Sequence, residues 1–382
     1  MIVIFLFGLT SLFSDFVYEG ARGIMGPYLA LLGANAMIVG LVSGLGEFLG
    51  YAMRLFSGYL VFKTRRYWGW VFGGYIISLL SIPALALVST WMGALVLLLL
   101  ERLGKAIRTP ARDTLLSLAV IPKRSGVAFG VHEALDQLGA LLGPLFISLM
   151  LYLGVSYKGS FLSLVIPALV ALFVLALTKR FYQSEEVAFA TGVSKEIRSD
   201  FTGAFWLYVL GIAFFGASMY SFYLIGFHLQ NRGFASQYIP LMYALAMAID
   251  ALAALFWGWL FDRKGLKILP LSSLSLLASV PLIFLGPLPL IVLGIVLWGI
   301  ALGALESIMR SALTFFVPRE KRALGFGIFH FLLGLAIMIG NLLYGYLYDK
   351  GLIMYLIILV FSFQIVSAAL LFCCQRSIRN NL

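Results

Sequence analysis

Charged side chains occur inside long apolar stretches of the sequence, where a lipid bilayer would surround them. A charge at the bilayer centre costs about 2.5–3.5 kcal/mol, so these groups are expected to face water or one another. Acids outnumber bases in this set, which predicts that some carboxyl groups are protonated or that a cation balances them. Both readings are typical of proton transfer or of binding a cationic solute. The set comprises Asp15, Glu19, Glu47, Glu101, Glu133, Asp136, Asp250, Glu306, Arg22, Arg54, Arg102 and Arg310.

The spacing of these charges brings several of them together. Asp15, Glu19 and Arg22 are separated by steps of four and three, which places them on one face of a helix. Glu133 and Asp136 are three apart, and Asp136 is our first choice of proton carrier, with Asp15 second. For each residue the alternative remains that it only pairs to hold helices together. The residues expected to line a substrate and proton cavity are Asp15, Glu19, Arg22, Glu47, Arg102, Glu133, Asp136, Asp250 and Glu306.

Composition indicates which elements must position these residues. The chain has 382 residues, of which 62% are hydrophobic and 11% are charged, whereas soluble domains are roughly a quarter charged. A bilayer span needs about 20 mostly apolar residues. The sequence therefore predicts an all-α membrane protein with twelve transmembrane helices. They are expected at 2–31, 36–62, 69–89, 91–116, 127–153, 159–178, 203–230, 236–261, 268–285, 288–316, 323–348 and 352–374.

The one long polar stretch divides the chain into two similar parts. We expect an N-terminal six-helix bundle at 1–180, a cytoplasmic linker at 181–202 and a C-terminal six-helix bundle at 203–382. Gly58 and Gly258 recur at matching positions in the two parts, each before a basic loop. Such a repeat predicts two pseudo-symmetric bundles around a central axis, which is a recognised transporter plan.

The distribution of charge predicts orientation. Lysine and arginine concentrate in the loops on one side, so both termini and the linker are expected in the cytoplasm and the protein in the plasma membrane. The net charge of +11 follows from this bias and calls for anionic lipid headgroups, not nucleic acid, as neighbours. Every third helix, beginning with 69–89, has no charge in its core and is expected to face lipid.

A motif spans the end of the helix expected at 236–261. Gly258, Asp262, Arg263, Gly265 and Lys267 form a pattern that resembles the G-x-x-x-D-R-x-G-[RK] signature of the major facilitator superfamily. The resemblance implies the major facilitator fold and secondary active transport by alternating access, in a monomer. It further implies that Asp262 latches the cytoplasmic side, with Arg310 as its expected partner.

The first half departs from this signature, because Phe62 stands at the position of the aspartate and Asp113 is a candidate substitute. Arg102 resembles the arginine of a second superfamily motif, which is tied to proton transfer. The alternative for Arg102 is that it fixes its helix against an acid such as Asp15. The complete set of expected gating residues is Gly58, Gly258, Asp262, Arg263, Arg310, Arg108, Arg112 and Asp113.

Gly139, Gly143 and Pro144 form a third motif in the helix expected at 127–153. It resembles the G-x-x-x-G-P motif of the exporter branch of the superfamily, although the usual following glycines are missing. Glycines at this spacing allow close helix packing, and the proline is expected to bend the helix. The resemblance implies export.

Other classes of protein find little support in the sequence. No Walker-type motif is present, so the sequence lacks the phosphate-binding loop that ATP-driven transport needs. The histidines are too dispersed for a zinc site, and no cofactor is expected. A membrane enzyme would have only Glu133, Asp136 and His132 as a candidate cluster, so we expect the chain not to be an enzyme.

The function expected from these features is proton-coupled export of small amphipathic or cationic organic molecules. Aromatic residues within the spans could line such a site. Two alternatives remain, namely export of a divalent metal ion through acids such as Asp15, Glu19 and Asp136, and proton-coupled nutrient uptake. The expected partners are a small-molecule substrate, protons and membrane lipids.

Overall fold

The chain folds almost entirely into helices. The computed structural model describes residues 2–119, 125–182, 201–272, 274–317 and 322–379, and no β-strand occurs in those ranges. The linker expected at 181–202 lies mostly outside the described residues. The helices of the first half are α1 Ile2–Leu31, α2 Ala36–Thr64, α3 Tyr67–Ala84, α4 Trp91–Ala119, α5 Ser125–Tyr152, α6 Tyr157–Ser163 and α7 Val165–Phe181, with a 3₁₀ turn η1 at Leu85–Leu87.

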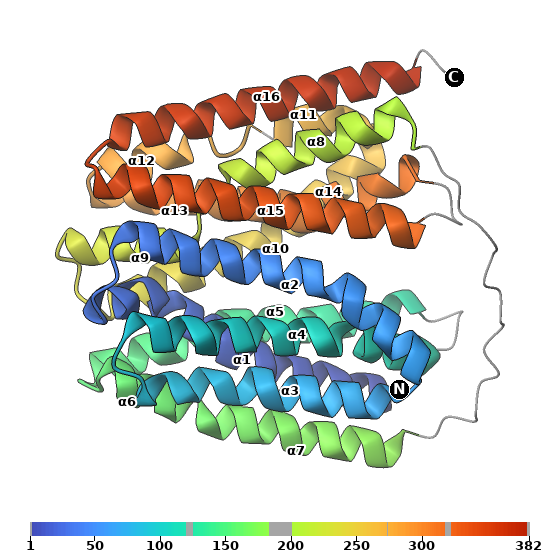
Figure 1. Ribbon diagram of the computed structural model, residues 1–382, viewed down its shortest axis with the longest axis vertical. Coiled ribbons are helices and arrows are strands. Elements are labelled where there is room, and N and C mark those ends of the chain that lie inside the picture. The colour runs from blue at the N-terminus through green and yellow to red at the C-terminus, as the bar shows by residue number, and fades with distance from the viewer. Residues whose placement is uncertain (1, 120–124, 183–200, 273, 318–321, 380–382) are drawn as a thin grey trace.

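The second half continues this pattern with more interruptions. Figure 1 shows the two halves one above the other, with both termini, the end of α7 and the start of the second half at the same end. We call this end the linker end and the opposite end the far end. The helices are α8 Gly203–Ser218, α9 Phe222–Asn231, α10 Tyr238–Lys264, α11 Leu269–Ser272, α12 Ser279–Leu285, α13 Leu288–Glu306, α14 Ile308–Ser311, α15 Arg322–Asp349 and α16 Ile353–Arg379, with 3₁₀ turns η3 Gly265–Ile268 and η4 Ala312–Phe315.

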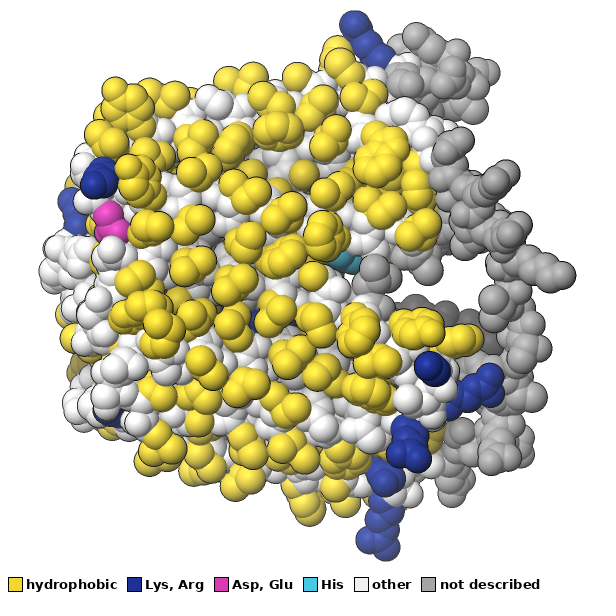
Figure 2. Space-filling view, in the orientation of Figure 1, with side chains coloured by type: hydrophobic (Ala, Val, Ile, Leu, Met, Phe, Trp, Pro, Cys, Tyr) yellow, Lys and Arg dark blue, Asp and Glu magenta, His cyan; other side chains and the backbone are white. Residues whose placement is uncertain are grey.

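The helices have the length and surface of a membrane protein. Ten segments of the described chain are long and apolar enough to cross a bilayer. Apolar side chains cover most of the face in Figure 2, with most of its lysines and arginines near the two ends. The expectation of an all-α membrane protein is confirmed. The count of twelve spans stays a prediction, because α4 carries many charges and 265–285 consists of short pieces.

Four of the expected helices are interrupted, which corrects the prediction. Breaks fall within the ranges 159–178, 203–230, 268–285 and 288–316. The break between α8 and α9 is stabilised by Asn341 of α15. Its side-chain oxygen accepts from the Ser221 N–H at 2.8 Å, and its Nδ2 donates to the Met219 carbonyl at 3.0 Å. Backbone groups freed at membrane depth need such partners, because lipid offers none.

Glycines set the closest packing in the first half. A Cβ atom at Gly139 would collide with the Leu12 carbonyl of α1, and one at Gly143 would collide with the Phe16 carbonyl. The two glycines of the G-x-x-x-G-P pattern therefore press α5 onto α1 backbone to backbone. Helix α5 itself is continuous through Pro144.

The two halves meet most closely toward the far end. A Cβ atom at Gly345 of α15 would collide with the Ala36 carbonyl at the start of α2, and one at Gly26 of α1 would collide with the Tyr223 carbonyl of α9. Helices α2 and α15 lie side by side there and diverge toward the linker end in Figure 1.

Candidate functional site

A cavity of about 410 Å³ lies between the two halves. Its lining comes from α1, α2, α4, α5, α9, α10, α13, α15 and the break before α9, and among the described residues none comes from α3, α6, α7, α11, α12 or α16. On α2 the lining residues lie around the middle of the helix, and on α4 and α5 they lie in the middle and on the side toward the linker end. Because the halves are packed together at the far end, the cavity opens toward the linker end.

The structure brings every predicted cavity residue to this one site. Asp15, Glu19, Arg22, Glu47, Arg102, Glu133, Asp136, Asp250 and Glu306 all contribute to the lining. Every third helix, expected at 69–89, 159–178, 268–285 and 352–374, supplies none of the described lining, as its composition indicated. The apolar helices could not have accommodated these charges elsewhere without exposing them to lipid.

Five side chains form a continuous ion-pair network across α1, α2 and α4. Glu19 pairs with Arg22 at 2.9 Å, and Arg22 lies 3.9 Å from Glu47. Arg102 pairs with Glu47 at 2.9 Å and with Glu101 at 3.2 Å. Acids and bases alternate along the network, so each charge has a neighbour of opposite sign. The alternative in which Arg102 pairs with Asp15 is wrong in this structure.

A second cluster surrounds Asp15. Its carboxyl group is hydrogen-bonded to that of Asp136 on α5, and the Ser11 hydroxyl donates to the Asp136 carboxyl group. The Lys105 ammonium lies 3.8 Å from Asp15. Two adjacent carboxylates repel each other, so Asp15 and Asp136 can stay this close only if the Lys105 ammonium, a proton or another cation offsets that repulsion.

Arg108 lies behind this cluster in a largely apolar environment. Its guanidinium stacks on the ring of Tyr75 at 3.9 Å and lies 5.6 Å from the ring of Tyr18. Only 1% of the residue is exposed, and its Nε and Nη1 atoms have no hydrogen-bond partner among the described residues. Aromatic faces stabilise such a buried cation. We expected Arg108 nearer the cytoplasm as a gating residue, and the structure places it at the cavity.

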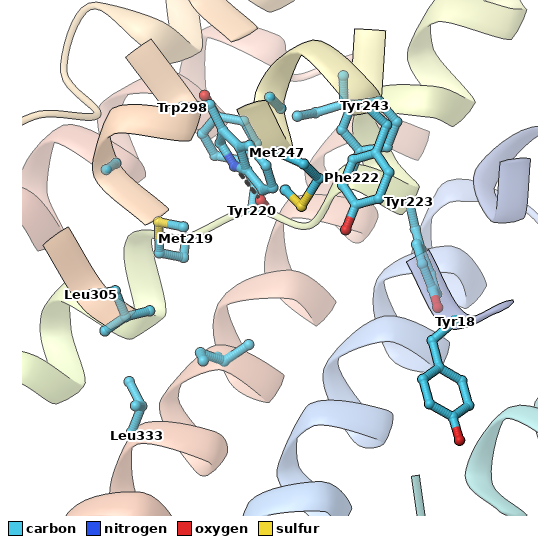
Figure 3. Packing of buried hydrophobic residues seen from close by; sticks show 14 of the residues in the cluster. Tyr18, Met219, Tyr220, Phe222, Tyr223, Tyr243, Met247, Trp298, Leu305 and Leu333 are labelled. Carbon is cyan, nitrogen blue, oxygen red and sulfur yellow. Dashed lines mark hydrogen bonds between the residues drawn. The ribbon is translucent and has the colours of Figure 1, made fainter. Parts of the chain in front are cut away.

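The second half supplies an aromatic and methionine-rich wall. Trp298 donates from its ring N–H to the Tyr220 carbonyl at 3.0 Å, and the ring of Phe222 lies 4.5 Å from that of Tyr243. Figure 3 shows these four side chains grouped beside Met247. Asp250 and Glu306 are the acids of this wall, and its described lining residues include no base. The two sides of the cavity therefore differ, one charged and one aromatic.

The balance of charge also differs from expectation. Sequence analysis placed twice as many acids as bases inside the membrane, but Lys105, Arg108 and Arg112 also line the cavity. Acids and bases are equally numerous in the lining of the first half, and several of them pair. The excess acids of the lining are Asp250 and Glu306 in the second half.

The expected gating residues lie in different parts of the structure and have different contacts. Arg112 pairs with its neighbour Asp113 at 2.8 Å. Asp262 and Arg263 are exposed near the linker end of α10, and Arg263 lies 4.1 Å from the Trp259 ring. The side chain of Arg310 lies outside the described residues, so its pairing with Asp262 stays a prediction.

The two glycines of the repeat do not mark close helix contacts in this conformation. A Cβ atom at Gly258 would meet open space, and one at Gly58 would meet Pro110 at an ordinary 3.9 Å. Sequence reasoning missed other residues of the site. Lys105 could have been found from its charge within the helix expected at 91–116. Nothing in the sequence marked Asn341 or Trp298, whose side chains donate hydrogen bonds to backbone carbonyls at a distant helix break.

A fold of membrane-spanning helices in two halves, with a central polar cavity open at one end, defines a polytopic membrane transporter. The family model of the Major Facilitator Superfamily matches residues 5–341 and 212–377. The chain belongs to this superfamily, whose members are transporters and not enzymes.

Relatives in sequence and structure agree with this placement. An uncharacterized protein of Mycobacterium tuberculosis is 37% identical over 374 residues, covering 96% of this chain and 91% of the relative. An uncharacterized MFS-type transporter of Methanocaldococcus jannaschii is 28% identical, covering 90% and 88%. A bacterial homolog of the human lysosomal transporter Spinster, solved inward-facing and unoccupied, superposes with a TM-score of 0.76 at 16% identity, covering 98% and 96%. The nucleoside transporter NupG superposes with a TM-score of 0.76 at 15% identity, covering 98% and 99%. At these identities the structures show the fold alone.

Proposed function

We propose that the protein exports small amphipathic or cationic organic molecules in exchange for protons, by exposing its cavity to each face of the membrane in turn. The observation that carries this proposal is the two-sided lining. One side holds the adjacent Asp15 and Asp136 carboxyl groups beside paired charges, and the other presents aromatic rings together with the acids Asp250 and Glu306.

The aromatic wall fits an organic cation. Ring faces carry negative electrostatic potential and attract cations, and apolar rings also bury the rest of such a molecule. Asp250, which is 3% exposed, adds a formal negative charge to this wall. Tyr220, Phe222 and Trp298 are placed to hold the apolar part of the substrate. A small amphipathic cation satisfies both kinds of surface at once.

The carboxyl pair supports coupling to protons. Asp15 and Asp136 face the same cavity as Asp250, so a bound cation and a bound proton repel each other. Loading the substrate therefore favours proton release, and binding a proton favours substrate release. Exchange of the two follows if each changes the balance between the two open forms of the cavity. Lys105 assists by stabilising the charge that remains on the pair.

The orientation of the chain completes the proposal. The basic loops favour a cytoplasmic linker, so we take the linker end as the cytoplasmic end, from which the cavity is entered. Substrate then enters from the cytoplasm and leaves at the far end in the plasma membrane. Nutrient uptake would use the same cavity in the opposite direction, and the G-x-x-x-G-P resemblance favours export.

The arrangement of the side chains that could ligate a metal favours organic cations over metal ions. A divalent metal site needs several His, Cys, Asp or Glu side chains converging on one point. Within the described part of the chain, no three such residues lie close enough to hold a metal ion. Glu19, Glu47 and Asp15 are instead paired with arginine or lysine.

Binding to purified protein tests the cation site. Tetraphenylphosphonium is an aromatic cation, and triphenylphosphine oxide is a similar molecule without net charge. We expect the cation to bind more tightly than the neutral compound, and this preference to be lost in Asp250→Asn. Asp262→Asn is the matched control, because Asp262 lies on the same helix outside the cavity lining. Equal binding of both compounds, or an intact preference in Asp250→Asn, would remove the proposed cation site.

A further inference from the structure

The last residue of α15 is hydrogen-bonded to the first turn of α2 in the other half. One carboxylate oxygen of Asp349 accepts the Ala36 N–H at 2.8 Å, and the other accepts the Met37 N–H at 2.8 Å. The next donor of that turn, the Ile38 N–H, is capped within α2 by the Asn35 side chain at 2.9 Å. The start of α2 is thus capped jointly by its own half and by the opposite half.

The position of Asp349 favours this contact over any role in its own helix. A carboxylate at the C-terminal end of a helix is unfavourable, because the helix dipole presents its negative end there. At the N-terminal end of a helix the same charge is favourable, and free N–H groups await acceptors. Asp349 therefore stands at the unfavourable end of α15 and at the favourable end of α2.

Glycines bring the two backbones together directly behind this contact. Cβ atoms at Gly40 and Gly345 would collide with the carbonyls of Asn341 and Ala36 across the seam between α2 and α15. One at Gly44 would come within 2.8 Å of the Met338 Cα atom. With no side chains between the helices, their ends cannot separate without breaking both hydrogen bonds to Asp349.

The matching seam between α5 and α10 is held differently. There the Ser148 hydroxyl donates to the Gln237 carbonyl at 2.7 Å, a contact between neutral groups. Hydrogen bonds to a charged group are stronger than neutral ones. The α2–α15 seam therefore has the stronger polar contact of the two.

We propose that Asp349 is a latch that keeps the far end of the cavity closed, and that its release from α2 opens that end. The inference rests on the proposed alternating access of the cavity. It does not depend on the substrate, the coupling ion or the direction of transport. The seam is a backbone contact with a charge-assisted hydrogen-bond pair at its end, so losing the charge shifts the closed form toward the open one.

Thiol labelling from the far side tests the latch on the full-length protein in proteoliposomes. Cys373 and Cys374 are first replaced by serine, and Val39→Cys is introduced as a reporter. Val39 lies on α2 and is fully buried, so a membrane-impermeant maleimide reaches it only when the seam opens. The labelling rate is compared in Asp349→Asn, Asp349→Ala and the neighbouring exposed variant Lys350→Gln.

We expect both Asp349 variants to raise the labelling rate about fivefold, the change that corresponds to losing a charge at an exposed helix end. Lys350→Gln should leave the rate unchanged. A second reporter, Leu175→Cys, is buried within the first half and should stay protected. Unchanged labelling of Val39→Cys in both Asp349 variants, or equal increases at both reporters, would overturn the latch. Because no substrate is added, a failure of proton-coupled transport would leave this result intact.

Discussion

The Tyr243 hydroxyl donates a hydrogen bond of 2.6 Å to the Glu19 carboxylate, and this bond joins the two halves of the protein inside the cavity. Glu19 belongs to the ion-pair network of the first half, whereas Tyr243 belongs to the aromatic wall of the second. The bond therefore links the aromatic wall of the second half to the ion-pair network of the first. In the proposed alternating access, opening the far end would separate α1 from α10 and break this bond.

Removing the Tyr243 hydroxyl should destabilise the protein. Tyr243→Phe loses a buried hydrogen bond to a charged group, which is worth about 1.5–3 kcal/mol. Tyr75→Phe is the control, because the Tyr75 hydroxyl is equally buried but has no hydrogen-bond partner in the described structure. We expect thermal unfolding in detergent to show a lower Tm for Tyr243→Phe and an unchanged or higher Tm for Tyr75→Phe. Equal Tm values for the two variants would contradict the structural role of this bond.

Arg102 and Glu47 should behave as coupled residues. Their ion pair at 2.9 Å connects α4 to α2, so removing one partner leaves the other with an unbalanced charge at the cavity. A double-mutant cycle with Arg102→Gln and Glu47→Gln should give a coupling energy of about 0.5–3 kcal/mol in unfolding experiments. The pair of Arg112 with the exposed Asp113 provides a comparison cycle, where we expect a coupling energy near zero. Additive effects at Arg102 and Glu47 would argue against the network.

Asp136 should set the pH dependence of transport. Asp136→Asn keeps the size of the side chain and an oxygen that can accept from Ser11, but it cannot exchange a proton with Asp15. We expect the variant to fold and to exchange labelled substrate across vesicles at a rate that no longer changes with pH. The wild-type rate should vary with pH over the same range. A pH profile of the variant that matches the wild type would assign the proton to another group.

Gly143 should tolerate no side chain. Gly143→Ala places a methyl group against the Phe16 carbonyl of α1, and such overpacking costs about 1–3 kcal/mol. Gly258→Ala is the matched control in α10, where a Cβ atom meets open space and alanine favours the helix by up to about 1 kcal/mol. Thermal unfolding should therefore move in opposite directions in the two variants. A destabilised Gly258→Ala would show that this glycine has a contact in another conformation.

The sequence could predict the all-helical membrane fold and which charged residues gather at one cavity. Charges in apolar helices are costly to expose to lipid. Asp15, Glu47 and Asp250 therefore line one interior cavity, although they lie far apart in the chain. Spacing alone also placed Glu19 and Arg22 on one helix face, where they pair. These results depend on the high cost of exposing charge to lipid, which leaves little freedom.

Partner choice could not be predicted in the same way. Asp15 faces Lys105 and Asp136 rather than Arg102, because the rotation and depth of α4 relative to α1 decide which base is near. The break before α9 contains no glycine or proline, and it is stabilised by Asn341 more than a hundred residues away in sequence. Asp349 likewise appears as an ordinary helix-end residue until α2 is placed beside it.

Proton movement driven by a substrate tests the central claim most directly. Purified protein in proteoliposomes with an internal pH-sensitive dye is given tetraphenylphosphonium, a divalent metal salt and a sugar in turn, without an imposed membrane potential. The account predicts a substrate-dependent proton flux with the aromatic cation, which is absent from vesicles that contain Asp136→Asn. Transport of the aromatic cation by the wild-type protein without any movement of protons would contradict proton-coupled exchange. It would leave the buried carboxyl groups with a structural role.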